Sequence, residues 1–209
     1  MSLYRRNALV CFTLVFLAAA VTGCAQTTPA KEFFMIEAVR PSGVVQTPSN
    51  ATLEVRLFNV DTAFASKNLV YRLGEFRYET DYYRQFLVSP GLMITERTRR
   101  WMFDSGLFKQ VLPPNSQITP TYTLQGIVTA LYGDFTNASA PVATMRIRFL
   151  LVGHGGEEGS IVFSRAYRVA QPLAAKTAEA LMDALSKDLT EILTQLEEDF
   201  RKHLAKPSS

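Results

Sequence analysis

Cysteine, histidine and tryptophan are scarce in this chain, and the scarcity of the first two excludes several kinds of active site. The 209 residues include two cysteines, two histidines and one tryptophan. A structural zinc site made of cysteines needs more than two of them, so that kind of site is excluded. Two histidines leave few options for a serine nucleophile paired with a base, and no Gly-x-Ser-x-Gly sequence occurs. We therefore expect no catalytic residues and no cofactor.

A strong charge of either sign is also missing. The net charge is +3 at pH 7, which gives no positive field of the kind that nucleic-acid binders use. The loop Gly153–Gly159 is not followed by the Gly-Lys-Ser/Thr of a phosphate-binding loop, so the chain itself should not hydrolyse ATP. His154, Glu157 and Glu158 could supply three metal ligands only if this loop folded back on itself. We expect a solvated loop there and no metal site.

The apolar run near the N-terminus is too short to span a membrane as a helix. It extends over Ala8–Val21, whereas a spanning helix needs ~20 apolar residues. The run follows Arg5 and Arg6 and ends at small residues, which is the order of a secretory signal peptide. An ordinary secreted protein and a protein with a single membrane anchor are the alternatives that stay open.

The residues Val21-Thr22-Gly23-Cys24 resemble the bacterial lipobox. The resemblance implies that Cys24 is acylated, becomes the new N-terminus and binds the membrane through its acyl chains. Residues 1–23 would then be the signal peptide, residues 24–31 a lipidated tether and residues 32–209 the folded domain. Because Cys11 would leave with the leader, no disulfide could form within one chain. Ala25 stands where an aspartate favours the inner membrane, so we expect a lipid-anchored protein of the cell envelope, at the outer membrane and facing the periplasm.

Hydrophobic periodicity predicts strands over much of the remaining chain. Weaker candidates lie at 33–38, 53–57, 69–73, 75–79 and 108–112, the third and fourth as a hairpin. Three stronger candidates, with apolar residues at alternate positions, are Tyr122–Tyr132, Met145–Leu151 and Ile161–Val169. The connections between these three are too short for crossover helices, which predicts an antiparallel meander.

Two helices are expected. Ser89-Pro90 is a typical helix start and Gly106 a typical stop. The second helix, about Ala174–Leu204, has apolar residues at three- and four-residue steps. Its ~45 Å length exceeds the width of a small sheet, so its far end could project, bend or pack on another subunit. The predicted fold class is α+β: a single domain with an antiparallel β-sheet packed by two helices, the C-terminal helix long and amphipathic.

Several short stretches resemble the ABC-type transport auxiliary lipoprotein family, and they cover nearly all of residues 32–209 in order. They include Leu69-Val-Tyr-Arg72, Tyr82-Tyr83-Arg84-Gln85-Phe86, Thr98-Arg-Arg-Trp101, Ser105-Gly-Leu-Phe108 and Tyr122-Thr-Leu-Gln-Gly126. One departure is the triplet Arg84-Gln85-Phe86, where many members have a triplet that ends in tryptophan. This departure suggests a divergent branch of the family.

The resemblance implies a membrane-anchored accessory subunit of an MCE-type ABC transport system. Such systems combine an ABC ATPase, a permease and an MCE-domain protein, and they move lipids or other hydrophobic molecules across the cell envelope. The chain would tether or assemble this complex without catalysis, in contact with the MCE-domain protein and the ATPase–permease complex. Two alternatives are a periplasmic lipid-binding carrier and a scaffold lipoprotein of another envelope complex, and a homo-oligomer is compatible with each.

Two groups of residues are candidates for contact with a partner or with lipid. Closely spaced tyrosines suit surfaces where the ring is buried and the hydroxyl is wet, although a hairpin edge packed on the core would show the same pattern. Arginines in the second half of the first helix could face lipid headgroups, or could form an ordinary charged helix face. The candidates are Tyr78, Tyr82, Tyr83, Phe86, Arg97 and Arg100.

Overall fold

The computed structural model describes residues 29–41, 49–113, 116–155 and 159–204. The chain separates into two units, and the larger one begins at Lys31. The signal-peptide and lipidation predictions, including Cys24, lie outside the described residues. None of the helices within the described ranges is long and apolar enough to cross a membrane.

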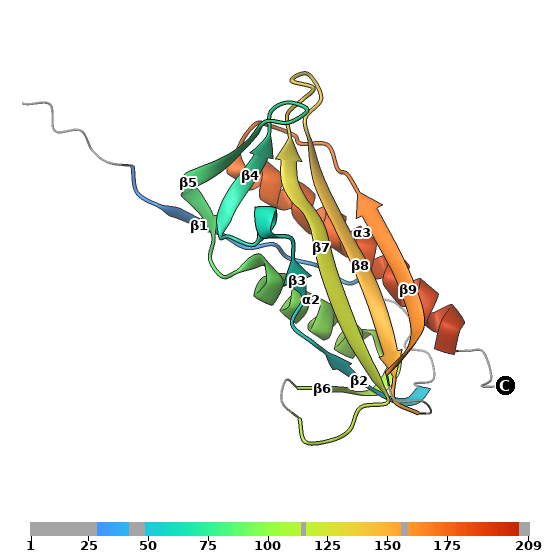
Figure 1. Cartoon of the computed structure of the whole chain (residues 1–209). Helices are drawn as coiled ribbons and strands as arrows, with labels where there is room; N and C mark the ends of the chain where they lie inside the picture. The colour runs from blue at the N-terminus through green and yellow to red at the C-terminus, as the bar shows by residue number, and fades with distance from the viewer. Residues whose placement is uncertain (1–28, 42–48, 114–115, 156–158, 205–209) are drawn as a thin grey trace, which may run out of the picture. The chain divides into compact units, whose positions relative to one another are not determined.

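The larger unit consists of a mixed β-sheet and two α-helices (Figure 1). In chain order its elements are β1 (Glu32–Phe34), β2 (Ser49–Val55), β3 (Asn59–Val60), η1 (Thr62–Phe64), β4 (Asn68–Arg72), β5 (Tyr78–Phe86), α2 (Pro90–Ser105), β6 (Phe108–Leu112), β7 (Tyr122–Asp134), β8 (Val142–Gly153), β9 (Ser160–Val169) and α3 (Ala178–Leu204).

Strand β7 organises the sheet, because three short strands share one of its edges. β2 pairs with its first residues, β3 with its middle and β4 with its last residues, all parallel to β7. β8 pairs antiparallel along its other edge. The pair β4–β5 therefore lies at one end of β7 and the pair β2–β6 at the other (Figure 1). At about 3.3 Å per residue, these ends are separated by up to roughly 40 Å along the strand.

The predicted α+β class, with two helices of which the second is long, is confirmed. The three strongest strand predictions form the antiparallel meander β7–β8–β9. The predicted hairpin is present as β4–β5, but its second strand is Tyr78–Phe86 and not 75–79. The sheet is mixed rather than antiparallel throughout, because β2 pairs in parallel with both β6 and β7 and β1 pairs in parallel with β5. Parallel partners are distant in sequence and need long connections, which strand periodicity does not reveal.

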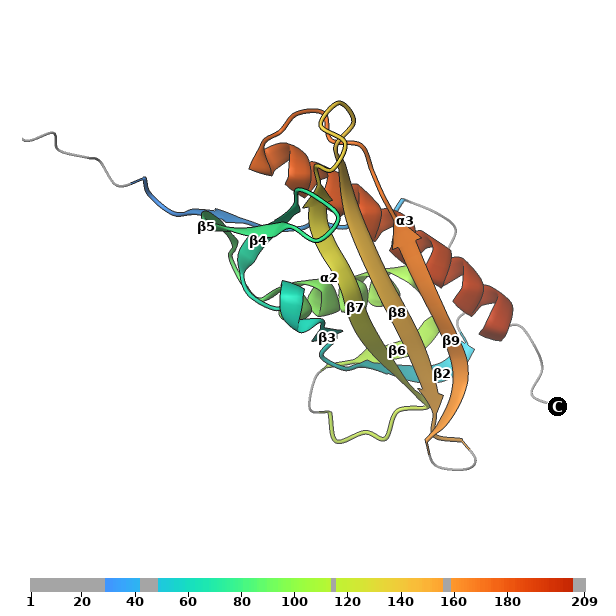
Figure 2. The ribbon, with the colours of Figure 1, turned by 45° about the horizontal axis from the view of Figure 1, so that its top comes forward.

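Both helices cover the same face of the sheet (Figures 1 and 2). On β8 the alternate residues Met145, Ile147 and Phe149 are fully buried on that face. Helix α3 packs against β8, and its Leu189 and Ile192 are also fully buried. The apolar stripe along each element is therefore what joins the layers, as expected for an amphipathic helix on a sheet.

The helix ends follow local chemistry. Helix α2 begins at Pro90, and Ser89 precedes it without a side-chain capping hydrogen bond. It ends before Gly106, whose φ of 64° is the left-handed conformation that glycine adopts at low cost. Helix α3 begins at Ala178, four residues later than predicted.

The far end of α3 packs on the sheet of its own chain. Phe200 is fully buried, and its ring lies 6.1 Å from that of Phe108 on β6 and 5.3 Å from that of Phe163 on β9. This end therefore packs within its own domain as far as Phe200, an outcome that was not among the three that we had expected.

Candidate functional site

The predicted tyrosines lie at a bulge in strand β5. Opposite β4, the pairing passes from Leu69–Asp81 directly to Asn68–Gln85. An advance of one residue on β4 therefore corresponds to an advance of four residues on β5. Residues 82–84 are left without a partner in the β4–β5 pairing. Such bulges bend a strand and redirect its side chains. We call residues 82–84 the tyrosine bulge.

Side chains on both strands hold the tyrosine bulge in shape. Asp81 Oδ1 accepts hydrogen bonds from the backbone N–H groups of Tyr83 and Arg84, each at 3.0 Å. Gln85 Nε2 donates to the backbone oxygen of Tyr82 and to Asn68 Oδ1, also at 3.0 Å. Backbone groups that leave a ladder need other partners, and these contacts supply them.

The tyrosine bulge presents two rings to solvent. Tyr82 and Tyr83 are 63% and 38% exposed, and their rings meet edge to face at 5.2 Å. Lys31 Nζ lies 4.4 Å from the centre of the Tyr82 ring, within the range of a cation–π contact. Tyr78, also on β5, is 46% exposed and packs edge to face on Tyr132 of β7.

Tyr71 on β4 supports this edge from the helix side. Its hydroxyl lies 3.4 Å from Asp81 Oδ2. Burial, and next the negative charge of Asp81, raises the pKa of Tyr71 to about 12. The phenol therefore stays protonated at physiological pH and can donate to Asp81.

The first residues of the larger unit are bound to it along their length. We call residues 31–41 the strap. Strand β1 pairs with residues 84–86, and Glu32 forms an ion pair with Arg84 at 3.1 Å. Further along, Arg97 Nε donates to the backbone oxygen of Ile36 at 3.1 Å, and its Nη2 donates to Glu37. The strap thus crosses from β5 to helix α2.

The strap ends at a buried ion-pair network on α3. Arg40 donates through Nε and Nη2 to the two carboxylate oxygens of Glu197, at 2.8 and 2.7 Å. Glu197 also accepts from Trp101 Nε1 at 2.9 Å and from Arg201 at 2.8 Å. Burial raises the pKa of Glu197, but the hydrogen bond from Arg40 and the other partners outweigh it, and the pKa is lowered overall. The carboxylate therefore stays charged and bound.

The predicted contact residues fall into three groups. Tyr78, Tyr82 and Tyr83 lie together at an exposed edge. Phe86 is 3% exposed and belongs to the core, so its inclusion in a contact surface is corrected: the chain has rejoined the sheet after the bulge, and Phe86 pairs with Phe34 of β1. Arg97 holds the strap, and Arg100 is exposed and lies 3.6 Å from Asp104. The structure does not bring either arginine to the tyrosines.

Sequence reasoning missed the residues that build this edge. Asp81, Gln85 and Asn68 act through a register shift that no single-strand pattern contains, and Arg40 and Glu197 are 157 residues apart. The sequence held one usable signal for this edge, the adjacent pair Tyr82-Tyr83. Neighbouring residues in a regular strand point to opposite faces, so two adjacent tyrosines do not fit a strand with one polar and one apolar face.

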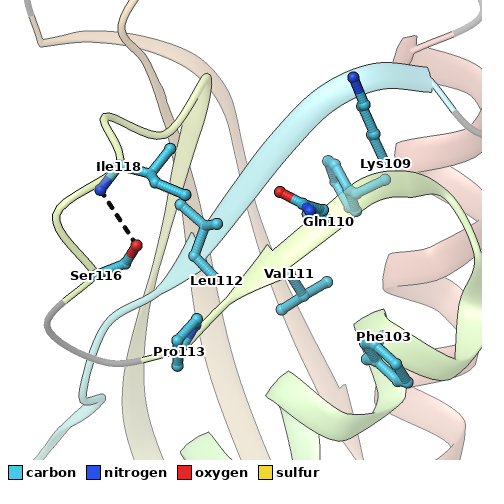
Figure 3. A pocket seen from close by; sticks show the side chains of 9 residues that line it. Phe103, Lys109, Gln110, Val111, Leu112, Pro113, Ser116 and Ile118 are labelled. Carbon is cyan, nitrogen blue, oxygen red and sulfur yellow. Dashed lines mark hydrogen bonds between the residues drawn. The ribbon is translucent and has the colours of Figure 1, made fainter.

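A groove of about 450 Å³ lies at the other end of β7, beside β6 (Figure 3). Phe103 of α2, Val111 of β6 and Ile118 give it apolar walls, and Lys109, Gln110 and Ser116 are polar residues of the same lining. The backbone N–H of Ile118 donates to Ser116 Oγ at 3.2 Å. The groove is larger than three other cavities lined by described residues, which have volumes of about 230, 220 and 130 Å³.

Among the described residues, no group of three or more histidine, cysteine, aspartate or glutamate side chains could hold a metal ion. His154 Nε2 lies 2.8 Å from Thr123 Oγ1, so this histidine contacts the sheet. Glu157 and Glu158, the other members of the loop that we considered as a ligand set, lie outside the described residues.

Comparisons with known proteins identify the fold. No protein-family model matches the sequence, and no curated protein matches it. The structure is similar to that of protein XCC0632 from Xanthomonas campestris, of family DUF330, with a TM-score of 0.69 and 19% identity over 79% of this chain and 92% of that one. It is also similar to hypothetical protein CT253 from Chlamydia trachomatis, with a TM-score of 0.51 and 8% identity over 73% and 98% of the two chains.

Lipoproteins occur among the more distant matches. One is lipoprotein GNA1162 from Neisseria meningitidis, with a TM-score of 0.39 and 12% identity over 69% of this chain and 99% of that one. A likeness at this level carries no argument about the present chain. The two closer matches, at 19% and 8% identity, concern the fold alone.

Proposed function

We propose that this protein is a lipid-anchored accessory subunit of an MCE-type ABC transport system in the cell envelope. Acylated Cys24 would hold it at the outer membrane, facing the periplasm. It would contribute contacts that tether or assemble the MCE-domain protein with its ATPase and permease, and it would perform no catalysis itself.

The attachment of the strap is the observation that carries this proposal. The folded unit begins at Lys31, seven residues after Cys24. Seven residues reach at most about 25 Å, so an acylated Cys24 would keep the unit next to the membrane. A strap fixed by β1, Arg97 and Arg40 would transmit this restraint to both helices, as an anchored assembly subunit requires.

Fractionation of cells tests the anchor. The variant Cys24→Ala should leave the membrane fraction, because its acyl chains would be absent. Cys11→Ala is the matched control and should stay with the membrane, since residue 11 would be removed with the leader. Membrane retention of a Cys24→Ala chain whose leader has been cleaved would contradict the proposal.

Affinity purification tests the transport assignment. After gentle extraction of the acylated protein, we expect an MCE-domain protein, an ABC ATPase and a permease among the co-eluting proteins. Consistent recovery of a different envelope complex would favour the scaffold alternative and refute the transport assignment.

The groove beside β6 supports a second candidate, a periplasmic lipid carrier. Its volume of about 450 Å³ and its partly apolar lining suit an amphipathic ligand such as a lipid, and pockets of this size hold small molecules in other proteins. Native mass spectrometry distinguishes the two candidates, because a carrier should retain lipid in a fixed stoichiometry and a tether should not. The same spectra would reveal any homo-oligomer.

A further inference from the structure

Three arginines form a cluster on the face of the sheet that the helices leave open. Arg146 and Arg148 lie on β8 and Arg168 lies on β9, and all three are exposed. Arg146 stands directly opposite Arg168 in the β8–β9 ladder, and Arg148 stands opposite Ala166. We call this cluster the arginine face.

The placement of the arginine face follows from strand alternation. Met145 and Ile147 are fully buried under the helices, so Arg146 and Arg148 point the opposite way. Figure 1 looks onto this open side, with α2 and α3 behind the sheet.

The arginine face has no ion-pair partner among the described residues. No carboxylate lies within 4.0 Å of any of the three guanidinium groups in those ranges. Two carboxylates on neighbouring segments are engaged elsewhere: Asp61 accepts from the backbone of Ala63, and Asp134 pairs with Arg72. Like charges directly opposite each other destabilise an antiparallel pair, so the Arg146–Arg168 pair is a cost that folding alone does not explain.

The arginine face continues into the tyrosine edge. Arg146 stands opposite Ala130 of β7. Tyr132 is two residues further along β7, on the same face, and it contacts the exposed Tyr78 of β5. The basic cluster and the exposed Tyr78 therefore share one side of the sheet, toward the end where β4 and β5 lie.

The tether predicted from the sequence ends at this edge. Lys31 lies over Tyr82, and no more than about 25 Å of chain separates it from Cys24. The membrane that holds the acyl chains would therefore be within reach of the tyrosines and of the arginine face.

We propose that the arginine face, together with Tyr78 and Tyr82, rests on the headgroups of anionic phospholipids in the membrane that holds the tether. This inference rests on the proposed lipid anchor and adds an orientation to it. Cationic side chains are attracted to anionic lipid surfaces within a Debye length, and tyrosine is enriched at membrane interfaces. The groove beside β6, at the far end of β7, would then be directed away from this contact and stay open to a protein partner.

The contact would be shallow. Glu79 and Arg77 are exposed beside Tyr78, with side chains 62% and 70% accessible, and charged groups are costly to place in hydrocarbon. The edge of β5 over residues 78–81 also has no strand partner on the side of β1 among the described residues, and its backbone groups need water or headgroups as partners. Both features favour the headgroup layer over the bilayer core.

A spin label in the arginine face tests the proposal with the full acylated chain. The mature chain would have no free thiol, because Cys11 is removed and Cys24 is acylated, so a single new cysteine can be labelled. Ala166→Cys places the label between the arginines without replacing any of them. Lys187→Cys is the control site, since Lys187 is 63% accessible and lies on α3, on the opposite layer.

The labelled proteins are reconstituted in vesicles of phosphatidylcholine with or without phosphatidylglycerol. We then compare collisions of each label with molecular oxygen, which concentrates in lipid, and with a water-soluble nickel chelate. In the anionic vesicles we expect the oxygen-to-nickel ratio at residue 166 to be several-fold higher than at residue 187. Without phosphatidylglycerol the difference should shrink.

Charge variants show whether the arginines cause the contact. The triple variant Arg146→Gln, Arg148→Gln and Arg168→Gln should lose the high ratio at residue 166. The matched control Arg100→Gln, Lys187→Gln and Lys202→Gln removes the same charge from exposed positions on the helices and should retain it.

The outcomes separate this inference from the proposed anchor. Protein that does not float with vesicles of either composition would refute the anchor, and with it this orientation. Protein that floats while residue 166 stays as aqueous as residue 187 would overturn the orientation alone. That second result would indicate that the arginine face serves an acidic protein partner.

Discussion

The carboxyl group of Asp188 is buried in helix α3 without a compensating charge. The residue is fully buried, and neither carboxylate oxygen has a hydrogen-bond partner of normal geometry among the described residues. Burial raises its pKa from the ordinary 3.8 to about 7, the negative charge of Glu191 adds to the shift, and the backbone of Gln171 opposes it. The folded protein therefore binds a proton that the unfolded chain releases at lower pH.

Asp188 should make the fold less stable as the pH rises from about 4 to about 7. Over that window the unfolded carboxyl is ionised while the folded one is still protonated, so folding becomes less favourable. The variant Asp188→Asn should remove this contribution and raise the free energy of unfolding at pH 8 by about 1–3 kcal/mol. Urea denaturation of both proteins at pH 4 and pH 8 measures the difference.

Asp183→Asn is the matched control for this titration, because Asp183 lies on the same helix but is 61% accessible and pairs with Lys187. Its stability should follow the wild type at both pH values within about 0.5 kcal/mol. Equal pH dependence of the Asp188→Asn variant and the wild type would contradict the prediction.

Asp81 should determine the shape of the tyrosine bulge. Without its carboxylate, the N–H groups of Tyr83 and Arg84 lose their acceptor, so Asp81→Ala should speed hydrogen exchange at both amides. Asp81→Asn keeps an oxygen at the same position and should restore part of the protection. Amide exchange followed by NMR measures both; unchanged exchange in Asp81→Ala would show that the bulge is held by other contacts.

The position of a single residue could be predicted from the sequence only where that position depends on its neighbours in the chain. The adjacent pair Tyr82-Tyr83 was a candidate contact site, with a hairpin edge packed on the core as the alternative, and the structure exposes both rings. The buried position of Phe86 was not predictable, because it depends on how many residues the bulge inserts opposite β4. On β8, Arg146 and Arg148 alternate with apolar residues in the sequence. That Arg168 stands opposite Arg146 follows only from the register of the β8–β9 pair.

Among the elements, the strap has the largest effect on how the protein could be anchored. It is a short segment with little regular structure, so its position depends on side-chain contacts with α2 and α3. Arg40 contributes the most buried of these, with 14% of its side chain accessible and Glu197 at 7%. Buried, bidentate pairs of arginine and carboxylate are far more sensitive to truncation than exposed pairs.

Arg40→Ala should detach the C-terminal part of the strap. Glu197 would keep Trp101 and Arg201 as partners, so we expect a loss of about 1–3 kcal/mol rather than unfolding. Limited proteolysis should cleave the variant within residues 31–41 faster than the wild type, and urea denaturation should report the lost stability. Arg100→Ala, which removes an exposed pair, should change stability by less than about 0.5 kcal/mol. Equal protease resistance of the two variants would argue against a strap held by Arg40.

The presence of a helix or strand could be predicted where neighbouring residues in the sequence indicate it. The pairing of the strands could not be predicted in this way. Pro90 and Gly106 bracket α2 as predicted, since a helix start and a left-handed C-cap have their own residue preferences. β2 pairs in parallel with β6 and β7, which follow it in the chain only after α2 and several strands. Pairing of that kind is decided by packing of the whole sheet.

At the scale of the whole molecule, one hydrophobic core reaches both of the ends for which we propose a function. It includes Phe86, next to the tyrosine bulge, and Phe200, which contacts β6 beside the groove. Trp101 of α2 belongs to the same core. A membrane-side edge and a partner-side groove built on one core would be held in a fixed relation, as a tether between a bilayer and a protein complex requires.

A shared core predicts that both ends unfold together. Phe86→Ala and Phe200→Ala each remove a buried ring, and each should cost about 3–5 kcal/mol. Because the core is continuous, either variant should shift one single transition, in which Trp101 fluorescence and far-ultraviolet circular dichroism change at the same urea concentration. Leu92→Ala, at a side chain that is 45% exposed, is the control and should shift the midpoint little. If one variant instead split the transition so that the two probes reported different midpoints, the two ends would be separate cooperative units. The orientation of one end on a membrane would then place no restraint on the other.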